Sequence, residues 1–181
     1  GAIPFDKIKK TDYEPAVDFS INQHKAEIEA IVNNPETPTF ENTIVAFDRS
    51  GQDLGRVLRV FEALTHAHGD DELLAISERI TPKYSEHSTS IILNEKLWER
   101  IKYVYENCDT TKLDTESKTL LKNVYTDFVD NGASLEGENR EKYREIMQKL
   151  SVATLKFGQN ALKATSAYSM WLTEEQLAGL P

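Results

Sequence analysis

Apolar residues recur at intervals of three, four or seven positions along most of this chain. The clearest run follows Pro38, and its members are Phe40, Ile44, Phe47, Leu54, Leu58, Phe61 and Thr65. Because an α-helix turns once every ~3.6 residues, this spacing gathers their side chains on one face. We therefore predict a long helix that Thr39 caps and that continues to about His68, with Gly69 as its stop.

Two glycines, Gly51 and Gly55, lie inside this predicted helix. A glycine in a helix interior costs ~1 kcal/mol relative to alanine, so its presence indicates a purpose. Gly51 continues the apolar register of the run, and we expect it to let another helix approach closely.

The same periodicity predicts a helix on either side of this one. The first extends from about Glu14 to Asn33, and Asn33-Asn34-Pro35 ends it because the residue before a proline avoids the helical region. The other begins at Asp70 and carries an apolar stripe as far as Ile91. Pro82 lies inside that stripe. Because the stripe keeps its phase across the proline, we expect one kinked helix.

Three further helices are predicted in the second half of the chain. Asn94 begins a shorter one, and Asp114 or Thr115 caps the next, which Asn131-Gly132 ends in the manner of a left-handed cap. Residues 137–166 form the last and longest helix.

The two ends of the chain follow a different pattern. We expect residues 1–13 to be an extended arm that Ile3-Pro4-Phe5 and Tyr13 could pin to the other helices. Residues 168–172 could form a short strand, and residues 173–178 one capped helical turn.

These elements predict an all-α fold, a bundle of about six long antiparallel helices in a single domain over residues 1–181. Composition agrees, because 39% hydrophobic and 28% charged residues suit helices with an apolar seam and a broad solvated face. Only 8 Gly and 6 Pro interrupt the chain, which favours few, long elements.

Charge and hydropathy narrow the function. The net charge of -9 argues against nucleic-acid binding, because an acidic surface repels phosphate backbones. No apolar run approaches the ~20 residues that span a bilayer, and no signal-peptide pattern is present, so we expect no membrane association. The chain begins with Gly1 rather than Met, which suggests that an upstream segment or tag was removed and hides any targeting signal.

A lone cysteine, Cys108, mildly favours a reducing compartment. We expect a cytoplasmic protein, with the periplasm as the alternative. Cys108 itself is interpreted as a half-buried helix residue rather than a catalytic thiol, because no neighbouring base is evident.

The histidines do not predict a metal site. The four are His24, His66, His68 and His87. None has a partner four residues on, as a helical zinc motif requires. His66 and His68 are two apart and would point ~200° away from each other on a helix, so they could bind a metal only weakly and only if that helix end frays. His87 lies on an apolar stripe, which is more typical of a core histidine.

Other chemistry-bearing residues also have structural explanations. Two carboxylate clusters are predicted to stabilise helix starts, and they comprise Asp70, Asp71 and Glu72, then Glu136, Glu138 and Glu141. No nucleophile elbow and no phosphate loop is present. Five aromatic residues could either pack in the core or contact a peptide, namely Trp98, Tyr103, Tyr105, Tyr168 and Trp171. We predict no catalytic, cofactor-binding or metal-binding residue in this chain.

Several segments, taken in order, carry a family resemblance. They read PFDKIKKTDYEPA (4–16), NNPETPTFENTIVAFDRSG (33–51), SEHSTSIILNEKLWERI (85–101), DFVDNGASL (127–135), SVATLKFGQNALKAT (151–165) and LAGLP (177–181). Together they resemble the amino-terminal region of the zinc metallopeptidases that include peptidyl-dipeptidase Dcp, oligopeptidase A and thimet oligopeptidase. The peptidyl-dipeptidase branch, whose members release dipeptides from the carboxyl end of peptides, is the nearest match.

The resemblance implies a longer, nearly all-helical bacterial hydrolase. Its His-Glu-x-x-His zinc site would lie far downstream, in a carboxyl-terminal catalytic domain of the same chain. The amino-terminal helices would form one wall of a narrow channel that admits short peptides and excludes folded proteins. On this interpretation the present chain is an inactive fragment cut at a domain boundary, and its uncovered apolar surface could cause self-association.

Two other functions remain open. The chain could be a stand-alone helical module that binds a protein or peptide, as the acidic amphipathic helices would allow. It could also be an independent hydrolase that uses residues without a recognisable motif.

Overall fold

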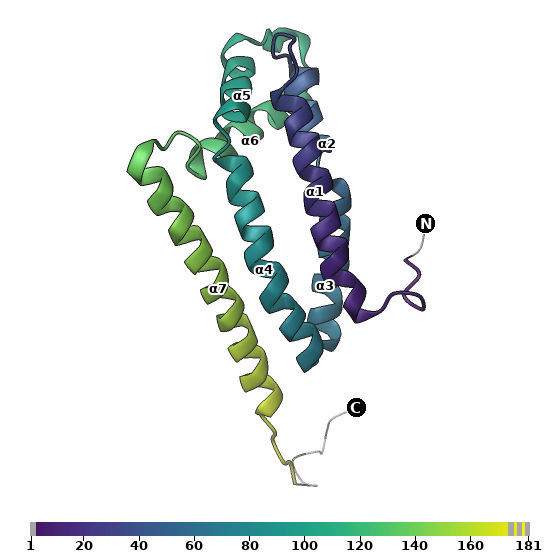
Figure 1. The fold of residues 1–181 in the computed structure, drawn as a ribbon. Helices are drawn as coiled ribbons and strands as arrows, with labels where there is room; N and C mark the ends of the chain where they lie inside the picture. The colour runs from purple at the N-terminus through teal and green to yellow at the C-terminus, as the bar shows by residue number, and fades with distance from the viewer. Residues whose placement is uncertain (1–2, 174–175, 177–178, 180–181) are drawn as a thin grey trace.

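The computed structural model describes residues 3–173, 176 and 179, and in this part of the chain it contains helices and no strand. Figure 1 shows long helices lying roughly side by side. The six long ones are α1 (Tyr13–Val32), α3 (Gln52–His68), α4 (Asp71–Ile92), α5 (Glu95–Asn107), α6 (Thr115–Asp130) and α7 (Gly137–Ala167). Four short ones join them: η1 (Lys10–Asp12), η2 (Phe40–Val45), α2 (Ala46–Arg49) and η3 (Thr110–Lys112). The predicted all-α bundle is confirmed.

Helix α1 packs against both α3 and α4, and α7 packs along α4. Helices α5 and α6 pack on each other and on the π-helical segment η2 at the upper end of the molecule in Figure 1. Helix α4 therefore lies between α1 and α7, and α7 lies on its outer side.

Buried apolar residues form two cores. The lower core lies among α1, α3 and α4 and contains Tyr13, Val17, Ile21, Leu54, Leu58, Phe61, Leu73, Ile76 and Ile80. The upper core lies where the end of α1 meets η2, α5 and α6, and contains Ile28, Ile31, Ile44, Ile91, Leu97, Ile101, Val104, Leu121, Val124, Phe128 and Ala133. Both cores are built from residues at the predicted three- and four-residue spacings.

Most predicted helix ends are confirmed by their caps. Side chains of Thr39, Asp70, Asn94 and Asp114 each accept a hydrogen bond from the backbone N–H three residues on, which satisfies a donor that the first turn leaves free. Helix α4 continues through Pro82 as one helix, as predicted.

The predicted continuous helix from residue 39 to 68 is wrong. The chain leaves helical geometry at Ser50, which is extended, and at Gly51, whose φ is +67°. A Cβ atom on Gly51 would lie 2.6 Å from the imidazole of His24 on α1. The expected close approach of another helix is thus confirmed, but it accompanies a break in the helix rather than contact along an unbroken one.

The predictions for the two ends need correction. Residues 168–172 form no strand, and their side chains are exposed. Most of the predicted turn at 173–178 lies outside the described residues. The arm at 1–13 is not extended throughout, since η1 occupies Lys10–Asp12 and Tyr13 already begins α1. Tyr13 does anchor it, with its ring 5.2 Å from that of Phe61.

Candidate functional site

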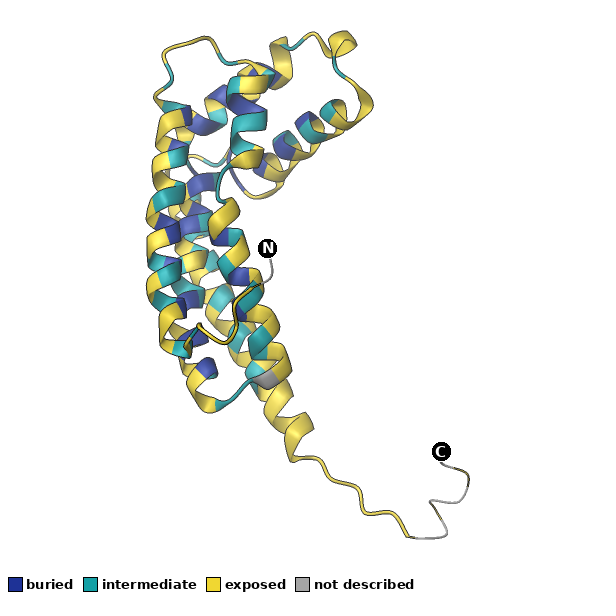
Figure 2. Ribbon diagram, turned by 90° about the vertical axis from the view of Figure 1, so that its right-hand side faces the viewer, coloured by how far each residue is buried: buried dark blue, intermediate teal, exposed yellow. Residues whose placement is uncertain are grey.

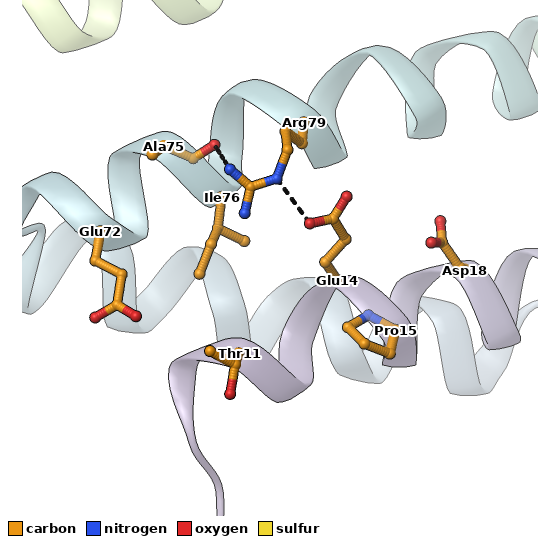
Figure 3. A pocket seen from close by; sticks show the side chains of 8 residues that line it. All are labelled: Thr11, Glu14, Pro15, Asp18, Glu72, Ala75, Ile76 and Arg79. Atoms are coloured by element: carbon orange, nitrogen blue, oxygen red, sulfur yellow. Dashed lines mark hydrogen bonds and ion pairs between the residues drawn. The ribbon is translucent and has the colours of Figure 1, made fainter.

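An open groove of about 620 Å³ lies between the start of α1 and α4. Figure 3 shows Glu14 and Asp18 on one side, Arg79 on the other, and Ile76 between the two helices. The Nε of Arg79 donates to Glu14 at 2.7 Å, and Lys83 donates to Glu14 at 3.1 Å and to Asp18 at 2.8 Å. These bonds join α1 to α4 along the groove.

The charges of the groove neutralise one another. Hydrogen bonds from Arg79 and then Lys83 lower the pKa of Glu14, and hydrogen bonds to Asp18 and Glu14 raise the pKa of Lys83. Both shifts favour the charged forms of Glu14 and Lys83, so neither residue is suited to act as a general acid or base near neutral pH. The ion pairs hold the two helices together, and the charged side chains of the groove could contact a charged peptide end.

A chain of polar side chains crosses from the break at Ser50 to α4. The Ser50 hydroxyl donates to the Phe47 carbonyl at 2.7 Å, so its oxygen accepts from Nε2 of His24 at 3.1 Å. Nδ1 of His24 then has no proton and accepts from Nε2–H of His87 at 3.0 Å. Nδ1 of His87 is buried and has no hydrogen-bond partner among the described residues.

Burial favours the neutral form of both imidazoles. It lowers the pKa of His87 to about 4, with the nearby His24 and Lys25 adding to the effect. Burial also lowers the pKa of His24, against a smaller opposing influence of Glu27. The prediction that His87 is a core histidine is confirmed, since its side chain is 3% exposed.

The arrangement superficially resembles a serine–histidine dyad, but the donor and acceptor roles in its hydrogen bonds are opposite to those of a catalytic dyad. A general base must accept the proton of the hydroxyl, whereas here the hydroxyl donates to a carbonyl and His24 donates to the hydroxyl. The cavity lined by these residues holds about 190 Å³. The hydrogen bonds among Ser50, His24 and His87 therefore connect the segment at the helix break to α1 and α4, and they do not activate the Ser50 hydroxyl.

The residues do not fit a zinc ion. His24 and His87 turn two ring nitrogens toward each other, but a catalytic zinc takes three protein ligands. Across the described part of the chain, no three His, Cys, Asp or Glu side chains are placed to hold a metal. His66 is exposed, and the side chain of His68 lies outside what the structure describes.

Arg100 is a buried cation that the sequence did not single out. It is 9% exposed and donates to the carbonyl oxygens of Asn34 and Glu36 and to the side-chain oxygen of Asn42. Burial lowers its pKa, with Glu36 opposing the shift. Arg100 thereby fixes the connection between α1 and η2. Its position on the apolar side of α5, four residues from Val104, was the available signal.

The remaining candidates divide between packing and exposure. Cys108 is half-buried, as predicted, but it is the residue after α5 rather than a residue within it. Trp98 and Tyr125 pack in the upper core region with ring centroids 5.3 Å apart. Tyr168 and Trp171 are exposed, at 73% and 92%.

The carboxylate clusters behave largely as helix starts. Asp70 caps α4 and also pairs with Lys10. Glu136 precedes α7 without a capping hydrogen bond from its side chain, and Glu138 pairs with Lys142 one turn later.

Several large apolar side chains are exposed on α7. No residue of this 31-residue helix is buried, and Ile146, Leu150 and Phe157 are 59%, 53% and 76% exposed. Figure 2 shows the lower part of α7 and the segment after it as exposed. None of the described helices is long and apolar enough to cross a membrane.

Comparison with known proteins places the chain beside peptidases. It is 36% identical over 177 residues to the dipeptidyl carboxypeptidases of Escherichia coli and Salmonella typhimurium, an overlap of 97% of this chain and 26% of each relative. It is 28% identical over 179 residues to oligopeptidase A of Escherichia coli. No family model matches.

The relatives just named are bacterial peptidases, and the chain spans about a quarter of their length. The resemblance found in the sequence is thereby confirmed: the chain matches the N-terminal region of the dipeptidyl carboxypeptidase and oligopeptidase A family.

Proposed function

We propose that this chain forms a channel-wall domain of a zinc-dependent peptidyl-dipeptidase or oligopeptidase and contributes no catalytic residue of its own. The observation that carries the proposal is 36% identity to a dipeptidyl carboxypeptidase over 97% of the chain. The identity to oligopeptidase A is lower, at 28%, which favours release of carboxyl-terminal dipeptides as the activity of the whole protein.

The division of labour follows from the side chains present. The described residues hold no cluster with three metal ligands, and the Ser50 hydroxyl is not activated. Zinc and the general base would therefore be held by a catalytic domain in the remainder of the protein. When bound there, zinc would polarise the scissile carbonyl and activate water.

The contribution of this chain would be steric. Two cores hold α1, α3, α4, α5 and α6 together, and the ties Glu14–Arg79, Asp18–Lys83 and His24–His87 join α1 to α4. A rigid helical wall excludes folded proteins from a narrow channel and admits short, unfolded peptides. Selectivity in this case depends on the width of the channel rather than on chemistry performed by the wall. We infer a cytoplasmic location, with the periplasm as the alternative.

The experiment compares this chain with the polypeptide encoded by the longer reading frame. Both are assayed on a short peptide blocked at its amino end, with and without zinc, and products are identified by mass spectrometry. We expect zinc-dependent release of carboxyl-terminal dipeptides by the longer polypeptide and no cleavage by the chain alone. Zinc-dependent cleavage by the chain alone, or a longer frame that encodes no His-Glu-x-x-His, contradicts the proposal.

The exposed face of α7 favours one second candidate, a stand-alone module that binds a protein or peptide. This alternative predicts a reading frame that stops soon after Pro181 and a binding partner whose affinity calorimetry can measure. A frame that continues into a zinc motif excludes it.

A further inference from the structure

The exposed side of α7 carries two parallel rows of residues. The first, which we call the apolar stripe, consists of Ile146, Leu150, Ala153, Phe157, Ala161 and Ala164, all exposed. Their spacing of three and four residues keeps them on one face over ~27 Å of helix. A solvated face of a helix is normally polar, so six apolar positions in phase, one of them a phenylalanine that is 76% exposed, indicate a surface that another element covers.

The second row is basic. Lys142, Lys149, Lys156 and Lys163 are seven residues apart and follow one edge of the apolar stripe, because seven residues make almost two complete turns. Lys142 and Lys149 pair with Glu138 and Glu145 on the same helix. Lys156 and Lys163 have no ion pair with any described residue.

This part of the chain also differs in charge from the remainder. From Ile146 to Leu172 there is no Asp or Glu and there are three Lys, whereas the chain as a whole has 30 acidic and 21 basic residues. The other residues therefore carry 18 basic and 30 acidic groups, a net charge of -12. A surface that binds the outer face of α7 should combine apolar residues with carboxylates.

Packing within the described part of this chain leaves the apolar stripe of α7 exposed. Helix α7 contacts α4, and its half-buried residues include Met147, Ser151, Leu155 and Gln159. The centre of this half-buried row lies more than a third of a turn from the centre of the apolar stripe. Helix α7 thus has two contact faces, and α4 covers one.

We propose that the outer face of α7 docks an amphipathic helix, flanked by carboxylates, from the part of the protein outside this chain. This inference rests on the proposed function, since the chain spans about a quarter of its peptidase relatives. The small residues Ala153, Ala161 and Ala164 allow a second helix to approach closely and pack beside Phe157. A second copy of this chain fits less well, because pairing one α7 with another would bring two lysine rows together.

Cysteine labelling tests the docking. In a Cys108→Ser background, Leu150→Cys and Phe157→Cys place a thiol in the apolar stripe, and Lys25→Cys on the exposed side of α1 is the control. Maleimide reaction rates are compared between this chain and the polypeptide of the longer reading frame. We expect the two stripe thiols to react at least tenfold more slowly in the longer polypeptide and the control to change less than threefold. Unchanged rates at both stripe positions, or a reading frame that supplies no further helix, overturn the proposal.

A second set of variants tests the charge. Replacing Lys149, Lys156 and Lys163 together by Glu should raise the labelling rate of Phe157→Cys in the longer polypeptide at least fivefold, whereas replacing all three by Arg should leave it unchanged. If Phe157→Cys is labelled at equal rates in the two triple variants, the proposal that carboxylates flank the docked helix is overturned. Protection that appears in the isolated chain as its concentration rises overturns the assignment in favour of a second copy.

Dipeptide release by the same longer polypeptide separates the two proposals. If the longer polypeptide releases dipeptides but its stripe thiols still react fast, only the docking proposal is contradicted. Slow labelling without zinc-dependent cleavage contradicts the peptidase assignment and leaves the contact established.

Discussion

Helices α4 and α7 lie against each other, yet they differ in how much of their surface is covered. Helix α4 has 22 residues and buries seven of them, Leu73, Ile76, Ser77, Ile80, His87, Thr89 and Ile91. Helix α7 has 31 residues and buries none. Both repeat apolar residues every three or four positions. Periodicity therefore indicates which residues share a face, but it does not indicate whether that face meets a partner in the same segment of chain.

The difference follows from position. Helix α4 lies between α1 and α7, and its first half contributes to the lower core. Helix α7 is the outermost helix and packs along α4 with half-buried side chains only. Hydrophobic stabilisation scales with the apolar area removed from water, so equal sequence patterns contribute unequally to the stability of this chain.

A matched pair of truncations gives the largest test of the contrast. Leu73 on α4 is 0% exposed, and Leu73→Ala should cost about 2–5 kcal/mol because it removes buried methyl groups and leaves a cavity. Phe157→Ala removes a larger side chain from α7 but should change stability by less than about 0.5 kcal/mol, since Phe157 is mostly solvated. Urea unfolding of both variants measures the two values. A cost above about 1.5 kcal/mol for Phe157→Ala would show that α7 is covered within this chain.

The pH dependence of stability tests the buried part of α4. The pKa of His87 is lowered to about 4 in the folded protein from 6.5, so the unfolded chain binds the proton more tightly. Stability should therefore be complete above about pH 7 and fall as the pH drops, by about 2 kcal/mol at pH 5. The lowered pKa of His24 acts in the same direction. Urea unfolding between pH 7.5 and pH 5 measures the loss.

The matched control is His87→Gln, whose amide can still donate to His24 but does not titrate. This variant should lose clearly less stability over the same interval. Glu14 does not affect stability between pH 7.5 and pH 5, because its pKa is lowered and its contribution to stability is lost only under more acidic conditions. If both proteins lose stability equally between pH 7.5 and pH 5, the buried imidazole of His87 is not the cause.

Alanine substitutions at two glycines should give the smallest changes in stability, and the two changes should have opposite signs. Gly51→Ala should cost about 1–2 kcal/mol, because φ is +67° and the new Cβ would meet His24. Gly158, in the interior of α7, has open space around the position that a Cβ would take, with no atom within 4 Å. Gly158→Ala should therefore stabilise by about 0.5–1 kcal/mol. Thermal unfolding of both variants checks the signs. Two changes of the same sign would contradict this difference between a close-packed glycine and an exposed one.

Local patterns predicted the helices well. Asp70, Asn94 and Asp114 were recognisable as caps, and the unbroken phase of the stripe across Pro82 predicted one helix, because capping and periodicity depend on neighbours in sequence. The break at Gly51 was not predicted. The apolar register continues across it, and the imidazole that lies close to Gly51 comes from α1.

The candidate site divides in the same way. The absence of a recognisable zinc motif could be seen in the sequence, and the family resemblance was later confirmed by the comparisons. The pairing of His24 with His87 and the role of Arg100 could not be predicted, because their partners are 63 and more than 50 residues away along the chain. Such contacts depend on which helices become neighbours.

The amino-acid sequence by itself determined the type of each long helix, most of their ends and the family to which the segment is related, because these depend on local backbone preferences and on residue identity in order. Only the tertiary structure decided which apolar faces are covered, where the second predicted helix breaks and which protons the two histidines carry. Those properties arise from contacts between residues far apart in the chain, and burial, rather than composition, sets their energies.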